Sequence, residues 1–156
     1  MTTKTQLQTK IQELEAELNS FKQQLNNYKE SPTLREATVG DVLEDGSIVL
    51  QKENGLALLV APKETEVRCA WSKEFSDAFD ALKSHGFNLS QWFIPTKEQL
   101  SLAYELIPQH FSSAIYWSST EVSSTIACSQ FFSGGNIFSY TKALTCCVRA
   151  FRCVVC

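Results

Sequence analysis

Charged side chains are scarce in the last third of this 156-residue chain. From residue 106 to residue 156, the only Asp, Glu, Lys or Arg residues are Glu121, Lys142, Arg149 and Arg152. About a quarter of the residues in a typical soluble domain are charged. We therefore expect this third either to bury its strands or to contact another molecule.

Long apolar runs are also absent. No run approaches the roughly 20 residues that a transmembrane helix requires, and the first residues lack the apolar core of a secretory signal. We therefore expect no membrane span and no export by the usual route, so that the protein either stays in the cytoplasm or leaves as part of a released particle. The net charge of −3 gives no electrostatic reason to expect nucleic acid as a partner.

Histidine is rare, with only His85 and His110 in the chain. Both lie in or beside loop signals, and neither has the spacing to Asp or Ser that would indicate a catalytic triad. We interpret both as solvated loop residues. Cys128 could act as a nucleophile with either histidine as its base, but no local feature indicates an activated thiol. The sequence predicts no catalytic residues and no cofactor.

The six cysteines are Cys69, Cys128, Cys146, Cys147, Cys153 and Cys156. An even number would suit disulfides outside a reducing cell, but most of them adjoin apolar or β-branched residues, where a free cysteine behaves as a small buried hydrophobe. We favour buried thiols over disulfides, and disulfides over metal ligands. Adjacent cysteines on a strand point to opposite faces, so Cys146 and Cys147 cannot easily share one tetrahedral metal site. We predict no metal site.

An apolar heptad pattern occupies the N-terminal region. Its members alternate in spacing between four and three residues, and they are Leu7, Ile11, Leu14, Leu18, Phe21, Leu25 and Tyr28. Opposite charges at the g and following e positions, Lys10 with Glu15 and Glu17 with Lys22, favour parallel chains. A single amphipathic helix packed on its own domain is the alternative, but the narrow stripe favours a coiled coil. Leucine at a with aromatics at d favours a trimer over a dimer.

Proline ends this helix, because the residue before Pro32 is disfavoured in the α region. The sequence therefore predicts a coiled-coil stalk over residues 1–31, a linker over residues 32–38 and a head over residues 39–156.

Strand and helix signals alternate through the first half of the head. Short β-prone runs at Val39–Leu43, Ser47–Leu50 and Leu56–Val60 are separated by turn residues. One helix is predicted from an apolar face and ends near His85-Gly86; this face consists of Trp71, Phe75, Ala78, Phe79 and Leu82. For a second helix, Thr96 and Gln99 form a capping-box signature, and Pro108 stops it.

From Ala114 onward the pattern is that of strands. The β-prone runs are Ala114–Trp117, Ile126–Phe132, Ile137–Tyr140 and Cys146–Val155. Gly134-Gly135-Asn136 is the clearest hairpin signal between two of them. The sequence predicts an α+β head with two helices and several antiparallel strands.

Several motifs follow one another along the head. They are Gly40-Asp41 with Gly46, Gly55-Leu56 to Ala61-Pro62, Trp71, Gly86-Phe87, Trp92-Phe93-Ile94-Pro95-Thr96-Lys97-Glu98-Gln99-Leu100, Tyr116-Trp117-Ser118-Ser119-Thr120-Glu121, Ala127, Phe131-Phe132, Gly135 and Val148-Arg149-Ala150-Phe151-Arg152. In this order they resemble the bacterial and phage domain family typified by the C-terminus of the Lcl collagen-like adhesin. The resemblance covers residues 39–156 and is carried by the order of the motifs. Phe93 and Ile94 depart from the arginine and leucine that are usual in the family, and the cysteine content near the end is also unusual.

The resemblance implies a C-type-lectin-like fold, related to the sulfatase-modifying and hypervariable phage-receptor folds. Members of the family act mostly in adhesion or ligand display, often at the end of a trimeric stalk. Calcium-dependent sugar binding is not implied, because the Glu-Pro-Asn and Gln-Pro-Asp sugar motifs are absent and the loops lack clustered oxygen ligands.

A polar and aromatic surface is the candidate for ligand binding. Eight of the fourteen residues from Ser112 to Thr125 are Ser or Thr, and such residues beside aromatics make adaptable recognition surfaces. We favour a core position for Trp117, and we expect Arg149 and Arg152 to pair with Glu121 or to cap carbonyl groups. The hairpin offers the better exposed face, since Asn136, Phe138 and Tyr140 alternate along it. The predicted binding residues are Asn136, Phe138, Tyr140, Ser133, Ser119 and Glu121.

Taken together, these features predict a non-enzymatic structural or adhesion protein of a phage virion, such as a fibre tip, head fibre or decoration protein. Its expected partners are two further copies of the chain, other virion proteins at the stalk, and a host surface glycan or protein at the head. The alternatives are a bacterial cytoplasmic or surface interaction protein with the same head, and an enzyme resembling the sulfatase-modifying oxidases.

Overall fold

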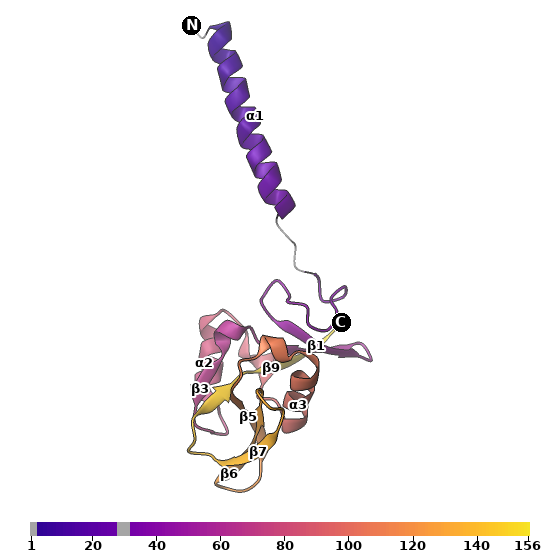
Figure 1. Cartoon of the computed structure of the whole chain (residues 1–156), viewed down its shortest axis with the longest axis vertical. Helices are drawn as coiled ribbons and strands as arrows, with labels where there is room; N and C mark the ends of the chain where they lie inside the picture. The colour runs from indigo at the N-terminus through magenta and orange to yellow at the C-terminus, as the bar shows by residue number, and fades with distance from the viewer. Residues whose placement is uncertain (1–2, 28–31) are drawn as a thin grey trace. The chain divides into compact units, whose positions relative to one another are not determined.

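The computed structural model describes residues 3–27 and 32–156 of the chain. The chain divides into two units, residues 1–31 and residues 32–156, and both sheets belong to the second unit (Figure 1). Within the described residues, no helix has both the length and the apolar character needed to cross a membrane.

The first unit consists of one helix, α1 (Lys4–Asn27). Thr3 caps its start, because its Oγ1 accepts from the Gln6 amide at 3.3 Å while the Gln6 side chain accepts from the Thr3 amide at 2.8 Å. No glycine or proline interrupts the helix. The predicted helix is thereby confirmed, while its assembly into a coiled coil stays a prediction. Tyr28, the last member of the predicted heptad, lies outside the described residues.

Two sheets form the head. The first sheet has the strand order β1-β2-β9-β4 and consists of β1 (Ile48–Glu53), β2 (Leu56–Val60), β9 (Phe151–Val155) and β4 (Trp92–Phe93). The second has the order β3-β8-β5-β6-β7 and consists of β3 (Val67–Cys69), β8 (Cys146–Val148), β5 (Ile115–Glu121), β6 (Ile126–Phe131) and β7 (Ile137–Thr141). All pairs are antiparallel except β5 with β8.

Two helices lie between these strands in the sequence, and the α+β class of the head is thereby confirmed. They are α2 (Ser76–Ser84) and α3 (Lys97–Leu106). Three short 3-10 turns cover Lys63–Thr65, Leu89–Gln91 and Pro108–His110. The predicted capping box is present, since Thr96 Oγ1 accepts from the Gln99 amide at 3.2 Å and the Gln99 side chain accepts from the Thr96 amide at 2.9 Å. Gly86 follows α2 with a φ of +85°, as expected of a glycine at C′.

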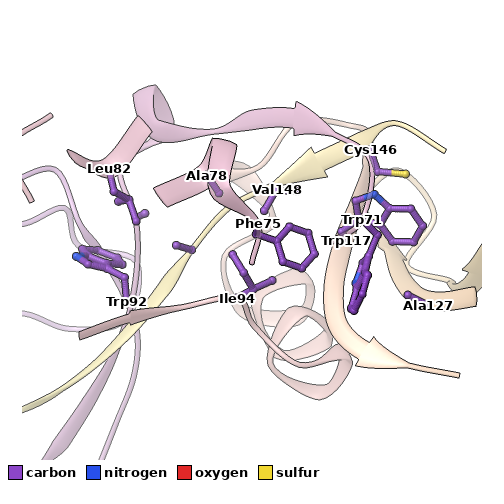
Figure 2. Packing of buried hydrophobic residues seen from close by; sticks show 12 residues of the cluster. Trp71, Phe75, Ala78, Leu82, Trp92, Ile94, Trp117, Ala127, Cys146 and Val148 are labelled. Atoms are coloured by element: carbon purple, nitrogen blue, oxygen red, sulfur yellow. The ribbon is translucent and has the colours of Figure 1, made fainter. Parts of the chain in front are cut away.

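Each helix packs into its own hydrophobic cluster. The α2 cluster contains Ala78 and Leu82 of that helix, and Figure 2 shows Phe75 lying between Ile94 and the indole rings of Trp71 and Trp117. The α3 cluster contains residues of that helix with rings from the loops and strands beside it: Leu100, Ala103, Ile107, Phe111, Tyr116 and Phe132. The core position predicted for Trp117 is confirmed, since the residue is fully buried.

The N-terminal edge of the head differs from the prediction in two ways. Residues 39–43 form no strand, and only Val42 makes an isolated bridge to Ile48. The reason is a turn, in which the Asp41 side chain accepts from the Thr38 amide at 2.9 Å. The segment 32–38 is also not a linker but part of the head. Ala37 is buried, and the Lys52 ammonium group donates to three backbone carbonyls of the segment at 2.9–3.0 Å.

The remaining differences concern where elements begin. The sequence predicted neither β3 nor β4, and Trp71 lies before α2 rather than on it. Phe75 precedes this helix in a left-handed conformation, with a φ of +43°. The run Cys146–Val155, predicted as one strand, breaks at Arg149-Ala150, because the chain there passes from one sheet into the other.

Candidate functional site

The apolar face of α1 is the first candidate surface. In the single chain its six described heptad residues are 52–72% exposed; they are Leu7, Ile11, Leu14, Leu18, Phe21 and Leu25. The one ion pair within the described part of the helix joins Lys10 Nζ to Glu13 Oε2 at 3.3 Å, and both side chains are largely exposed. We call these six residues the heptad seam. Its exposure shows that α1 offers an apolar stripe that the other described residues of this unit leave uncovered.

The hairpin of β6 and β7 is the second candidate surface. Phe138 is exposed, and its ring centroid lies 6.3 Å from that of Phe131 and 5.7 Å from that of Tyr140. Ser133 and Asn136, which belong to the connecting turn, are also exposed. We call these five residues the aromatic hairpin. Four of the six predicted binding residues therefore lie together, and Phe131 is a neighbour that was not among the predicted residues.

The backbone of this hairpin is accessible as well, because β7 is an edge strand of its sheet. Its five residues, Ile-Phe-Ser-Tyr-Thr, contain no charge and no proline. Proteins usually place charged residues or proline on an edge strand, because these residues prevent pairing with another chain. The aromatic hairpin thus combines unpaired backbone groups with a row of aromatic side chains, and both features suit contact with a partner.

A hollow on another part of the head contains the remaining two predicted residues. It has a volume of about 450 Å³ and is lined by Trp71, Lys73, Phe75, Phe79, Trp92, Phe93, Ile94, Ser119 and Glu121. We call it the aromatic hollow. Ser119 and Glu121 lie on it and not on the aromatic hairpin, so the structure divides the predicted binding residues into two groups. Trp71, Phe75 and Trp92 are each at most 9% exposed, which leaves little of their ring faces for a ligand.

The rim of the aromatic hollow carries a fixed pair of charges. Lys142 Nζ lies 2.9 Å from Glu121 Oε2 and 4.1 Å from the centre of the Trp71 ring. The hydrogen bond from Lys142, with the positive charges of Lys142 and Lys73, lowers the pKa of the Glu121 carboxyl group. The expected pairing of Glu121 with an arginine is therefore wrong. Arg152 instead pairs with Asp45 at 3.1 Å.

Arg149 is buried and serves the interior of the head. Its Nε donates to the Ala61 carbonyl at 2.9 Å, and its Nη1 donates to the His110 carbonyl and lies 3.7 Å from Glu66 Oε2. The expected capping of carbonyls is confirmed. The hydroxyl of Tyr116 donates to the same Glu66 carboxylate at 2.6 Å. Burial, followed by this hydrogen bond, raises the pKa of Tyr116. These contacts form a buried polar network and leave no open site.

The two histidines have structural contacts. His85 is exposed at the end of α2, and its Nδ1 lies 2.8 Å from the Ala81 carbonyl. His110 is half-buried, with Nε2 at 3.0 Å from the Gly40 carbonyl, so its interpretation as a solvated loop residue is wrong. Cys128 is buried and contacts the Ser139 hydroxyl at 3.9 Å. Across residues 3–27 and 32–156, no three His, Cys, Asp or Glu residues are placed to hold a metal ion.

The cysteines are all free thiols in this structure. Cys128, Cys146 and Cys147 are buried and Cys69 is half-buried, as expected, but Cys153 and Cys156 are exposed. Cys146 lies in the α2 cluster and Cys147 in the α3 cluster, which confirms that these neighbours point to opposite faces.

A comparison with protein-family models finds no match for this chain, and a comparison with curated proteins finds none either. The family resemblance of residues 39–156 is therefore a prediction from the order of its motifs.

Proposed function

We propose that the protein is a non-enzymatic display protein of a phage virion. In this proposal the N-terminal helices of three chains form a parallel coiled coil that docks on other virion proteins. The three heads, with the C-type-lectin-like fold that the motifs imply, bind a glycan or protein on the host surface. The phage assignment rests on the family resemblance, while the oligomer and the binding surface rest on features of the structure.

The exposed heptad seam is the observation that carries this proposal. Burying a leucine-sized side chain stabilises an assembly by roughly 1.5–3 kcal/mol, and six such residues lie on one stripe of α1. A helix of this length is marginally stable in water when it is alone. Association therefore supplies the stability that the isolated helix lacks. Three linked heads also bind a surface more tightly than one, because the later contacts are intramolecular.

Sedimentation equilibrium of the full chain tests the oligomer. We expect a mass three times the 17.5 kDa of one chain, and a monomer at micromolar concentration would contradict the proposal. Leu14→Asp places a charge in the heptad seam and should give monomers. Ala16→Asp, on the opposite face of the same helix, should leave the trimer intact. A dimer would retain the coiled coil and refute the trimer.

The aromatic hairpin is the proposed contact surface of the head. Exposed aromatic side chains supply contact area at low entropic cost. Phe138 and Ile137 are exposed apolar neighbours on opposite faces of β7, so substitution of Ile137 is a control for substitution of Phe138. Binding of the trimer to an array of bacterial surface glycans tests this. We expect Phe138→Ser to abolish a signal that Ile137→Ser retains. Equal signals from both variants would place the contact elsewhere, and the aromatic hollow would then be tested through Glu121→Gln.

A further inference from the structure

Two cysteines face each other across neighbouring strands of the second sheet. Cys69 ends β3 and Cys146 begins β8, and the antiparallel register pairs them directly. The same register pairs Arg68 with Cys147 and Val67 with Val148. No other two cysteines occupy paired positions in the strands of the described residues.

Both side chains point to the same face of the sheet. Cys146 and Val148 belong to the α2 cluster, and Val67 and Cys69 pack against that cluster from β3. Between them in sequence, Cys147 faces the α3 cluster, and Arg68 is exposed. Trp117 Nε1 donates to the Cys69 carbonyl at 3.2 Å and so holds this backbone against the cluster. Figure 2 shows Cys146 beside the rings of Trp71 and Trp117.

This arrangement is close to the geometry of a disulfide. Directly opposed residues of an antiparallel pair have Cβ atoms about 4.5–5.5 Å apart, and a disulfide requires roughly 3.5–4.5 Å. The two Cβ atoms must therefore approach each other by at most about 2 Å. Such an approach is available because β3 has only three residues and lies at the edge of its sheet.

We propose that Cys69 and Cys146 are a disulfide site, which closes when the protein meets a disulfide oxidant such as oxidised glutathione. The Cys69 thiolate attacks one glutathione sulfur, forms a mixed disulfide and releases one reduced glutathione. The Cys146 thiolate then attacks the Cys69 sulfur and releases the second reduced glutathione. Two protein thiols lose two electrons and two protons in total, and one glutathione disulfide becomes two thiols. Cys69 reacts first, because it is half-buried whereas Cys146 is only 3% exposed.

Burial controls how fast this site closes. It raises the pKa of the Cys146 thiol to about 11, and burial together with the negative charge of Asp77 raises the pKa of Cys69. Only the thiolate attacks a disulfide, so both thiols are poor nucleophiles at neutral pH. The reaction is therefore slow at neutral pH and accelerates as the pH rises towards these pKa values. The chemistry does not depend on the proposed function, although release from a cell would supply the oxidising conditions.

The test uses the full chain with Cys153→Ser and Cys156→Ser, which removes the two exposed thiols of the six cysteines. The folded protein is incubated with oxidised glutathione, quenched with acid, and analysed by thiol titration in denaturant and by non-reducing peptide mass spectrometry. We expect the four thiols to fall to two, with one linked pair of peptides that contain Cys69 and Cys146. The rate should rise about tenfold for each pH unit below the pKa values.

Control variants separate the site from general reactivity. Adding Cys69→Ala to the same background should leave three thiols and no linked peptides, with native tryptophan emission showing that the head is folded. Four thiols unchanged after incubation would overturn the proposal. A linkage that involves Cys128 or Cys147, or a glutathione adduct on Cys69 that never resolves, would overturn it as well.

Discussion

The buried charge of Arg149 is stabilised by hydrogen bonds to backbone carbonyl groups. Two carbonyls, from Ala61 and His110, accept hydrogen bonds from its guanidinium group, and the Glu66 carboxylate lies 3.7 Å from Nη1. Burial lowers the pKa of this arginine, while the nearby Glu66 opposes that shift. The residue thus joins the segment between β8 and β9 to two loops, and its guanidinium carbon Cζ lies 4.9 Å from the centre of the Phe111 ring.

Removing this charge should destabilise the head. Arg149→Met keeps the apolar stem but leaves the Ala61 and His110 carbonyls without this donor and Glu66 without the opposite charge, so we expect a loss of about 2–4 kcal/mol in the free energy of unfolding. Urea unfolding followed by tryptophan fluorescence measures it. Arg35→Met, at an exposed position, should change the stability by less than about 0.5 kcal/mol. A similar loss in both variants would mean that the internal hydrogen bonds of Arg149 contribute little.

The buried pair Cys146 and Cys147 predicts a loss of stability in alkali. Burial raises the pKa of each thiol from its ordinary value of 9.0 to about 11. The unfolded chain therefore loses these protons at lower pH than the folded chain, and stability declines as the pH rises from the unfolded value through the folded one. Urea unfolding of the reduced protein near pH 7 and at about pH 10 measures the decline. The double variant Cys146→Ala and Cys147→Ala should show a smaller decline, and an equal one would contradict the assignment.

Among the elements, the hairpin of β6 and β7 depends on one glycine. Gly135 has a φ of +78°, and a Cβ added there would lie 2.5 Å from Tyr104 Cε1. Its neighbour Gly134 has no such φ, and a Cβ there would meet Phe131 Cδ1 at an ordinary 3.5 Å. The turn therefore tolerates a side chain at one glycine and not at the other.

Alanine substitutions at these two glycines should have unequal effects. Gly135→Ala combines a left-handed backbone with a clash and should cost about 2–4 kcal/mol of stability, whereas Gly134→Ala should cost under about 1 kcal/mol. Thermal unfolding of both variants makes the comparison. Equal midpoints would show that the Tyr104 ring moves aside without cost.

Elements that carry their own local signal could be predicted from the sequence. The start of α3 follows from Thr96 and Gln99, because the side chain of each accepts a hydrogen bond from the backbone amide of the other. The turn before β7 follows from two adjacent glycines. The break between β8 and β9 could not be found, because the run Cys146–Val155 is apolar on both sides of Arg149. Its cause is a tertiary one, namely the bonds of Arg149 to segments far away in sequence.

The candidate surfaces also divide into those that local sequence patterns predict and those that depend on tertiary contacts. The heptad seam and most of the aromatic hairpin are local patterns of period 3.5 and 2, so their members could be named in advance. The aromatic hollow gathers residues from three separate segments between Trp71 and Glu121. No spacing rule connects those segments, and Trp71 and Phe75 were assigned instead to a helix face.

For the molecule as a whole, the unfolding of the stalk and the unfolding of the head should depend differently on protein concentration. An oligomer of α1 gains stability with concentration, whereas the head unfolds as a unit within one chain. All three tryptophans, Trp71, Trp92 and Trp117, belong to the head, so fluorescence reports the head alone. We expect the helical signal in circular dichroism to shift with protein concentration while the fluorescence midpoint stays constant. Two midpoints that shift together would indicate that the heads unfold only with the oligomer.

The placement of β8 and β9 has a consequence for how the chain is made. These strands come last among the strands, yet β8 lies between β3 and β5, and β9 lies between β2 and β4. A ribosome must therefore finish residue 148 before β3 can join the second sheet, and residue 155 before β4 can join the first. Earlier hairpins can pair while translation continues, but their apolar faces stay exposed until the final strands are made. In that interval, other copies of the chain or chaperones can bind these faces. A product that ends before residue 146 would lack the strands that join β3 to β5 and β4 to β2, so both sheets would be incomplete.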